Sequence, residues 1–167
     1  MRNSHDVANG GTPSHHGGPG TDVAFAELLA GSHERVVGTR ILPEGLAGAE
    51  AARWLYGEAP FGLLAHDTSA DPSFVYANAT AQKCFEYSWE EFMGMPSRLS
   101  AEADRREKRQ AFMDGVLRQG YVSGYRGVRI ARSGRRFWIE DTTVWNLLDR
   151  DGTLQGQAAL IRGWADA

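Results

Sequence analysis

The sequence predicts an α+β domain in which five antiparallel strands form one sheet and helices cover one face of it. Two short strand-like runs are followed by several helical segments, and three long runs rich in β-branched and aromatic residues come last. Strands joined by tight turns pair antiparallel, so the three long runs form a meander. Helices must cover a face of this sheet for a core to form, and two further helices precede the domain.

Composition indicates a single globular domain. The chain has 167 residues, of which 42% are hydrophobic and 23% charged, which suits one core. No apolar run is long enough for a membrane span and no secretory signal is present, so we expect a cytoplasmic protein without membrane contact. The formal net charge of −3 argues against nucleic acid as a partner. A lone cysteine, Cys84, excludes a disulfide framework and a multi-thiolate metal site.

The N-terminal region divides into a tail and a helical extension. Residues 1–21 are mostly Gly, Pro, Ser, His and Asn, which predicts a disordered tail. His15 and His16 lie in this tail without carboxylate or thiolate neighbours, so we predict no metal site there. Residues 22–57 then predict two helices.

The helical extension has recognisable ends. Asp22 is a suitable N-cap for the first helix, which we expect to stop at Gly31. Pro43 fits the first turn of a second helix that would run to Gly57.

The main domain is predicted over residues 58–167. It opens with a hairpin of two strands, Phe61 to Asp67 and Phe74 to Ala77. Asn78 is a predicted N-cap for the next helix, and Ser88 with Glu91 matches a capping box for a further short one.

A charged helix and three strands complete the domain. Acidic and basic residues four positions apart predict a helix between Ala101 and Gln119, whose charges we interpret as a solvated face. The three long strands are predicted at Tyr121 to Ala131, Arg136 to Leu148 and Leu154 to Trp164.

This order of elements resembles the PAS fold, and several segments resemble PAS strands and helices. A closer resemblance is to the MEKHLA domain, a PAS-related family, although the hexapeptide that gives the family its name is missing. The resemblance implies a sensory or interaction domain without a known reaction. The PAS resemblance rests on Phe74 to Ala81, Tyr87 to Gly94, Gly134 to Glu140, Asp149 to Gly152 and Gly156. The MEKHLA resemblance rests on Gly127 to Ile130, Arg135 to Glu140, Val144 to Leu147 and Gly156 to Ala159.

The resemblance also bears on cofactors. Light-sensing PAS proteins need a cysteine just after the helix that ends at Gly94, and this chain has Ser97 in that stretch. Arg129 and Ile139 replace the asparagines that would contact a flavin ring, so we expect no flavin adduct. His66, at the end of the first strand, is poorly placed as a haem ligand, and a capping or surface role is the simpler interpretation. We therefore predict no cofactor.

Common catalytic motifs are missing, which favours binding over catalysis. We predict a non-catalytic sensory or regulatory module with a small-molecule pocket between sheet and helices; a filled core is the alternative. The candidate pocket residues are Leu63, Ala65, Phe85, Phe92, Phe112, Arg129, Phe137, Ile139, Asp141 and Trp145.

Strand register decides where Arg129 points. A tight turn at Ser133 and Gly134 would place Val128 on the same face as Phe137, and the apolar pattern favours this register. A one-residue slip, which the PAS resemblance favours, would place Arg129 there instead. An inward Arg129 would need Asp141 or an anionic ligand as its partner.

Two surface features have simpler interpretations. Trp54, Trp138 and Val144 predict a dimer face, because Trp138 and Val144 would share one side of a strand. This supports a second hypothesis, a homodimeric interaction scaffold without a ligand. Arginines also gather near the last hairpins, and we interpret them as keeping a hairpin tip soluble. They are Arg126, Arg129, Arg132, Arg135 and Arg136.

Overall fold

A five-stranded antiparallel sheet in the order β2-β1-β5-β4-β3 organises the computed structural model, which describes residues 19–167. The histidines of the predicted tail, His15 and His16, therefore lie outside the described residues. The helices are α1 (Val23–Val37), α2 (Gly48–Gly57), α3 (Ala79–Phe85), α4 (Trp89–Phe92) and α5 (Arg106–Gln119), with short 3₁₀ turns at Ser97–Ser100 and Ala103–Arg105. The strands are β1 (Gly62–His66), β2 (Phe74–Ala77), β3 (Tyr121–Ile130), β4 (Arg136–Leu148) and β5 (Leu154–Asp166).

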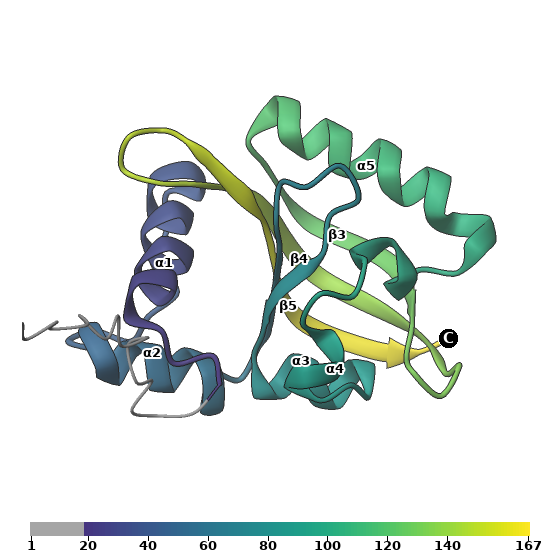
Figure 1. Ribbon diagram of the computed structural model, residues 1–167, viewed down its shortest axis with the longest axis horizontal. Helices are drawn as coiled ribbons and strands as arrows, with labels where there is room; N and C mark the ends of the chain where they lie inside the picture. Colours follow the sequence, from purple (N-terminus) through teal and green to yellow (C-terminus); the bar gives the residue numbers. More distant parts are fainter. Residues whose placement is uncertain (1–18) are drawn as a thin grey trace, which may run out of the picture.

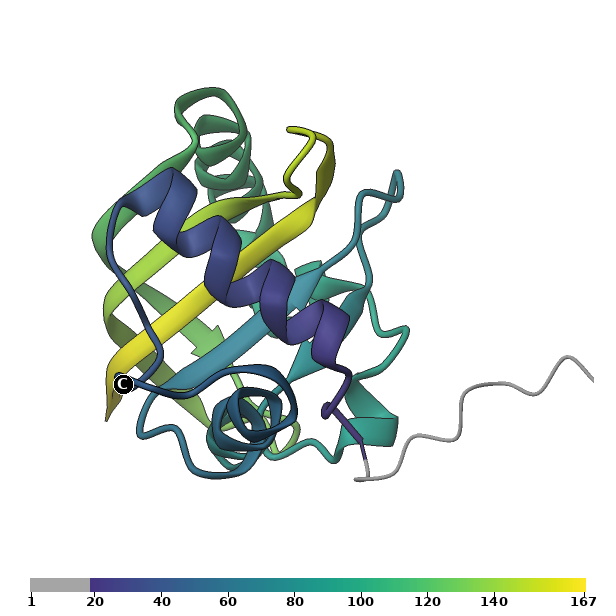
Figure 2. The same ribbon diagram turned by 90° about the vertical axis from the view of Figure 1, so that its left-hand side faces the viewer.

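The predicted fold is confirmed, and the structure adds the position of the N-terminal helices. Helices α3, α4 and α5 cover one face of the sheet, called here the inner face, while α1 and α2 cover the opposite, outer face (Figure 1). Seen from the outer side, α1 lies across the strands (Figure 2). Among the described residues, no helix is both long and apolar enough to cross a membrane.

Each face has its own core. The outer core contains Ala26, Leu29, Ala52, Leu55, Leu63, Ala65, Tyr76, Trp145, Leu147, Ala158 and Leu160. The inner core contains Leu64, Phe74, Ala77, Ala81, Cys84, Phe85, Phe92, Ala131, Phe137, Ile139 and Ile161, with a smaller cluster of Met113, Val116 and Val144 under α5. Burial of both sets stabilises the sheet from its two sides.

Polar contacts fix α1 on the outer face. The indole Nε1–H of Trp145 donates to Ser32 Oγ at 3.0 Å, and the His33 ring meets the Trp145 ring edge-on with 4.8 Å between centroids. His33 Nδ1 lies 2.7 Å from the carbonyl oxygen of Thr39, so it carries the hydrogen and donates it. All three side chains are buried, so these contacts are shielded from water.

Two predicted helix ends are wrong. Asp22 caps α1 as predicted, accepting from Phe25 N, but the helix continues past Gly31 and ends at Gly38. Gly38 has a φ of 94°, a left-handed conformation that glycine adopts without strain. Helix α2 begins at Gly48 instead of near Pro43, and residues 43–47 form an irregular connection before it.

Asn78 joins three elements in the buried interior. Its Oδ1 accepts from Ala81 N, which confirms the N-cap of α3, and also from Leu63 N in β1. Its amide nitrogen donates to Leu55 O and Phe61 O. The side chain thus satisfies backbone groups at the end of α2, at the start of β1 and in the first turn of α3. The capping box of Ser88 and Glu91 is also confirmed.

Asp141 interrupts the alternation of side chains along β4. Its φ of 47° lies in the left-handed region, and pairing of β4 with β5 skips from Glu140 to Thr142. Before Asp141 an odd-numbered residue, Ile139, faces the inner layer, and after it an even-numbered residue, Val144, does so. A regular pleat would place these two residues on opposite faces.

Candidate functional site

The inner face contains a small cavity that adjoins a larger pocket open to the surface. The cavity has a volume of about 50 Å³, and the pocket, between the 67–72 loop, α5 and the start of β5, about 300 Å³. The cavity is lined by Leu64, Ala65, His66, Phe74, Phe85, Ser100, Arg109, Met113, Arg129, Ile139, Val144, Gln157, Ala158, Ala159 and Ile161. Four of these residues also line the pocket: His66, Arg109, Met113 and Gln157. The shared residues place an apolar space behind a polar entrance.

Arg129 points into this space. It pairs with Phe137 across the hairpin and is 7% exposed, so the register favoured by the PAS resemblance is the one present. The turn allows this because Ala131 N donates to Arg135 O, leaving three residues between them. Arg129 donates from Nη1 to Val128 O at 2.9 Å and from Nη2 to the Tyr125 hydroxyl at 3.4 Å. Neither acceptor is an anion.

Arg109, predicted to lie on a solvated helix face, reaches the same cavity from α5. Its Nε is buried and has no hydrogen-bond partner among the described residues. Burial and the nearby Arg129 cation lower the pKa of Arg109 to about 10, so it remains charged near neutral pH. A signal for this position exists in the sequence: Arg109 precedes Phe112, Met113 and Val116 by three, four and seven residues, the spacing of one helix face.

The other arginines of the predicted basic cluster differ from this pair. Each of them forms an ion pair at the surface: Arg126 with Glu140, Arg132 with Glu91, Arg135 with Glu86 and Asp166, and Arg136 with Glu102. Among the described ion pairs, none includes Arg109 or Arg129. Within the predicted cluster, Arg129 is therefore the member that forms no described ion pair, and Arg109 on α5, at the same cavity, forms none either.

A chain of buried polar side chains borders the entrance. His66 Nε2 lies 3.1 Å from Gln157 Oε1, and its Nδ1 lies 2.7 Å from Ser97 Oγ. Gln157 Nε2 in turn donates to Asn146 Oδ1 and Met113 O. This arrangement assigns the hydrogen of a neutral imidazole to Nε2, with Nδ1 accepting from Ser97. Burial lowers the pKa of His66, and the nearby Arg109 cation lowers it further. The predicted surface or capping role for His66 is wrong.

The predicted pocket residues fall on both faces of the sheet. Phe85, Phe92, Phe137 and Ile139 lie in the inner core, and Phe112 stacks on Tyr125 with 3.9 Å between ring centroids. Leu63 and Trp145 belong instead to the outer core, and Ala65 packs there while also bordering the cavity.

The predictions that Trp145 lines the pocket and that Asp141 pairs with Arg129 are both wrong, and the backbone at Asp141 explains the first. The alternation changes at Asp141, so Trp145 leaves the face that Ile139 occupies. Asp141 itself is exposed and forms no ion pair with Arg129 among the described residues.

The predicted dimer face does not form one patch. Val144 is buried under α5, whereas Trp138 is half-buried with the Arg126 guanidinium 3.7 Å above its ring. Trp54 packs edge-on against Phe61 beside the outer core. The change of parity at Asp141 again explains why Trp138 and Val144 separate.

The inner residues do not suit a flavin adduct. The Ser97 hydroxyl is hydrogen-bonded to His66. The thiol of Cys84, the single cysteine in the sequence, is buried on α3, and burial raises its pKa to about 11. A cavity of about 50 Å³ is also far smaller than a three-ring cofactor. In the part of the chain that the structure describes, no three His, Cys, Asp or Glu residues gather as a metal site would require.

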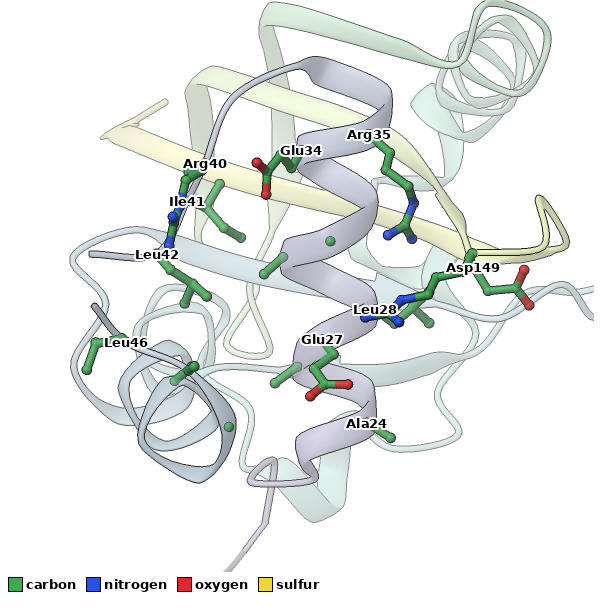
Figure 3. A pocket seen from close by; sticks show the side chains of 17 residues that line it. Ala24, Glu27, Leu28, Glu34, Arg35, Arg40, Ile41, Leu42, Leu46 and Asp149 are labelled. Carbon is green, nitrogen blue, oxygen red and sulfur yellow. The ribbon is translucent and has the colours of Figure 1, made fainter. Parts of the chain in front are cut away.

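A more open groove lies along α1 on the outer side of the molecule. It has a volume of about 400 Å³ and is lined by α1, the 40–48 segment and the turn after β4. Figure 3 shows Glu34 and Arg40 on one side of α1 and Arg35 with Asp149 on the other. Glu27, Glu34, Arg35 and Arg40 are exposed, so water solvates the charges of this groove. It is a weaker candidate than the inner cavity.

Comparison with solved structures defines the class of fold. A PAS domain from Colwellia psychrerythraea is 16% identical with a TM-score of 0.55, covering 65% of this chain and 86% of that one. An RNA-binding light-oxygen-voltage receptor is 19% identical with a TM-score of 0.54, covering 65% of this chain and 30% of the receptor. A light-oxygen-voltage domain studied with a flavin analogue is 16% identical with a TM-score of 0.53, covering 64% and 77%. The chain therefore has a PAS-like fold.

The chain belongs to the MEKHLA domain family, whose model matches residues 23–166. The match includes both N-terminal helices as well as the sheet, and it confirms the resemblance found in the sequence. No curated protein matches this sequence.

Proposed function

We propose that this MEKHLA domain is a sensory or regulatory module that binds a small molecule at the inner face and catalyses no reaction. The observation that supports the proposal best is the apolar cavity behind the polar entrance formed by His66, Arg109 and Gln157. A filled core would not need the buried Arg129 and the buried Nε of Arg109 beside an internal space, because burying charge without a partner destabilises a fold.

Native mass spectrometry of the purified protein tests this proposal. We expect a bound mass that is lost on denaturation, or a rise in melting temperature with members of a metabolite panel. Replacement of Ala159 by Leu should fill the cavity and remove binding, because Ala159 lines the cavity. Ala111→Leu, at an exposed position of α5, is the matched control and should bind normally. No bound mass and no thermal shift would contradict the proposal.

A homodimeric scaffold is the second candidate, on a different surface from the one predicted. Leu117 and Tyr121 are 48% and 40% exposed and lie on either side of the turn between α5 and β3. Exposed large apolar side chains that lie close together favour a partner surface. Light scattering after size exclusion tests this: a dimer that the paired change Leu117→Ser and Tyr121→Ser converts to monomer would support it. A monomer at high micromolar concentration would contradict it.

A further inference from the structure

Arg109 and Arg129 place two positive charges beside one apolar cavity without an anion among the described residues. We propose that a small aliphatic carboxylate occupies this cavity, with its charged group between the two guanidinium groups. This inference rests on the proposed ligand-binding function and names the class of its ligand.

The two arginines lack what an anion would supply. Arg109 Nε is buried without an acceptor, and the like charge of Arg129 acts on Arg109 and lowers its pKa. An unpaired buried N–H and two neighbouring cations both destabilise the ligand-free fold. A carboxylate between them would accept from the free Nε–H and neutralise the repulsion.

The carboxylates that border the larger surface pocket do not supply an anion to the two arginines. Asp67 accepts from the Ser69 hydroxyl and from Ser73 N, and Asp71 pairs with Arg98. Asp114 accepts from Gln110. Each is occupied locally at the rim, so the charge needed at the cavity must come from a molecule that enters it.

Size and polarity of the cavity favour an aliphatic acid over an inorganic anion. The walls away from the arginines are apolar and include Phe85, Ile139 and Ile161, which suit a short alkyl chain. A planar carboxylate matches the donor geometry of a guanidinium group, and a pair of arginines can hold its two oxygens. Inorganic phosphate would leave the apolar wall without a contact.

Titration calorimetry with acetate, propionate, butyrate and hexanoate tests the proposal on the full chain. We expect saturable binding of the short acids, lost as the alkyl chain outgrows a cavity of about 50 Å³, with little heat from the matched alcohols or from inorganic phosphate. Arg109→Gln and Arg129→Gln should each weaken binding by roughly 10- to 100-fold, the usual range for loss of a charge-assisted hydrogen bond. Arg126→Gln is the matched control, because Arg126 lies on the same strand but pairs with Glu140 at the surface; its binding should not change.

Melting temperature separates a ligand-binding arginine from a structural one. Arg109→Met removes one of two cations at the same cavity, so the ligand-free variant should melt at a higher temperature and lose the shift caused by carboxylates. A lower melting temperature would make Arg109 a structural residue and overturn the proposal. If the Met variant does not fold, Arg109→Lys, which retains the charge but not the planar donors, should fold and bind more weakly than the native chain. Native affinity in that variant would equally overturn it.

The outcomes also separate this inference from the proposed function. A neutral bound mass, with no effect of carboxylates, would overturn the carboxylate and leave the ligand-binding function intact. Tighter binding of phosphate than of any carboxylate would do the same. Failure of every ligand class in both experiments would overturn both.

Discussion

Single residues decide how this domain is joined together, and Asn78 is the clearest case. It is fully buried and makes four hydrogen bonds to backbone groups of α2, β1 and α3 and the segment between them. A short polar side chain at a helix start is common in sequences, but this one also links elements that are distant along the chain.

Asn78→Ala should therefore lower the free energy of unfolding by about 3 kcal/mol or more, because it leaves several buried backbone groups unpaired as well as removing a cap. Ser88→Ala, which removes the exposed cap of α4, is the control and should cost only about 1 kcal/mol. Urea denaturation measures both. Equal costs would show that the wider contacts of Asn78 contribute nothing.

Trp145 and Ser32 provide a second test at this scale. The hydrogen bond between them joins β4 to α1 in a buried setting. A double-mutant cycle with Trp145→Phe and Ser32→Ala should give a coupling energy of about 1 kcal/mol. Simple additivity of the two changes would mean that packing alone holds α1 on the sheet.

At the scale of elements, Asp141 controls which face β4 presents. Its left-handed backbone disfavours residues with a Cβ and suits glycine. Asp141→Gly should leave stability unchanged or raise it, whereas Asp141→Val should lower it by about 1–2 kcal/mol. Thermal denaturation compares these variants. Glu140→Val, at the neighbouring position with ordinary backbone, is the control; an equal loss there would remove the role of the backbone.

Local patterns in the sequence predicted elements well because their causes are local. The caps at Asp22, Asn78 and Ser88 depend on groups three residues apart, and all five strands come from runs of strand-forming residues. Gly31 misled the prediction of where α1 ends. A glycine costs a helix only about 1 kcal/mol, and contact of α1 with the sheet outweighs that cost.

The site was harder to predict because it depends on relations between elements. The face of Arg129 depends on the length of one turn, and the faces of Trp145 and Val144 depend on the backbone of Asp141. The charges around Arg109 fitted a solvated helix, although its spacing from Met113 and Val116 pointed inward. Alternation alone could not show that these side chains meet.

For the whole molecule, two buried histidines link stability to pH. Burial lowers the pKa of both His33 and His66, whereas in the unfolded chain imidazoles ionise near pH 6.5. Above that pH the two imidazoles are neutral in both the folded and the unfolded chain, so they add no pH dependence to the free energy of unfolding. Below it the unfolded chain takes up protons first, and the free energy of unfolding falls.

The slope should reach at most about 1.4 kcal/mol per pH unit for each histidine. Urea denaturation between about pH 7.5 and pH 5.5 measures it. The carboxyl groups whose pKa values are lowered, such as Asp67 and Asp149, act nearer pH 4 and lie outside this window. The double variant His33→Asn and His66→Asn should flatten the slope. A slope as steep as that of the native chain would assign the effect to other groups.

The cover that α1 and α2 place over the outer face also sets a condition on partners. These helices belong to the same chain, so they compete for the sheet at an effective local concentration in the millimolar range. A separate protein at micromolar concentration could displace them only if its intrinsic affinity for that face were about a thousandfold higher than theirs. A protein partner that responds to ligand binding by this domain is therefore expected to contact the exposed side of α1 and to leave the helix on the sheet.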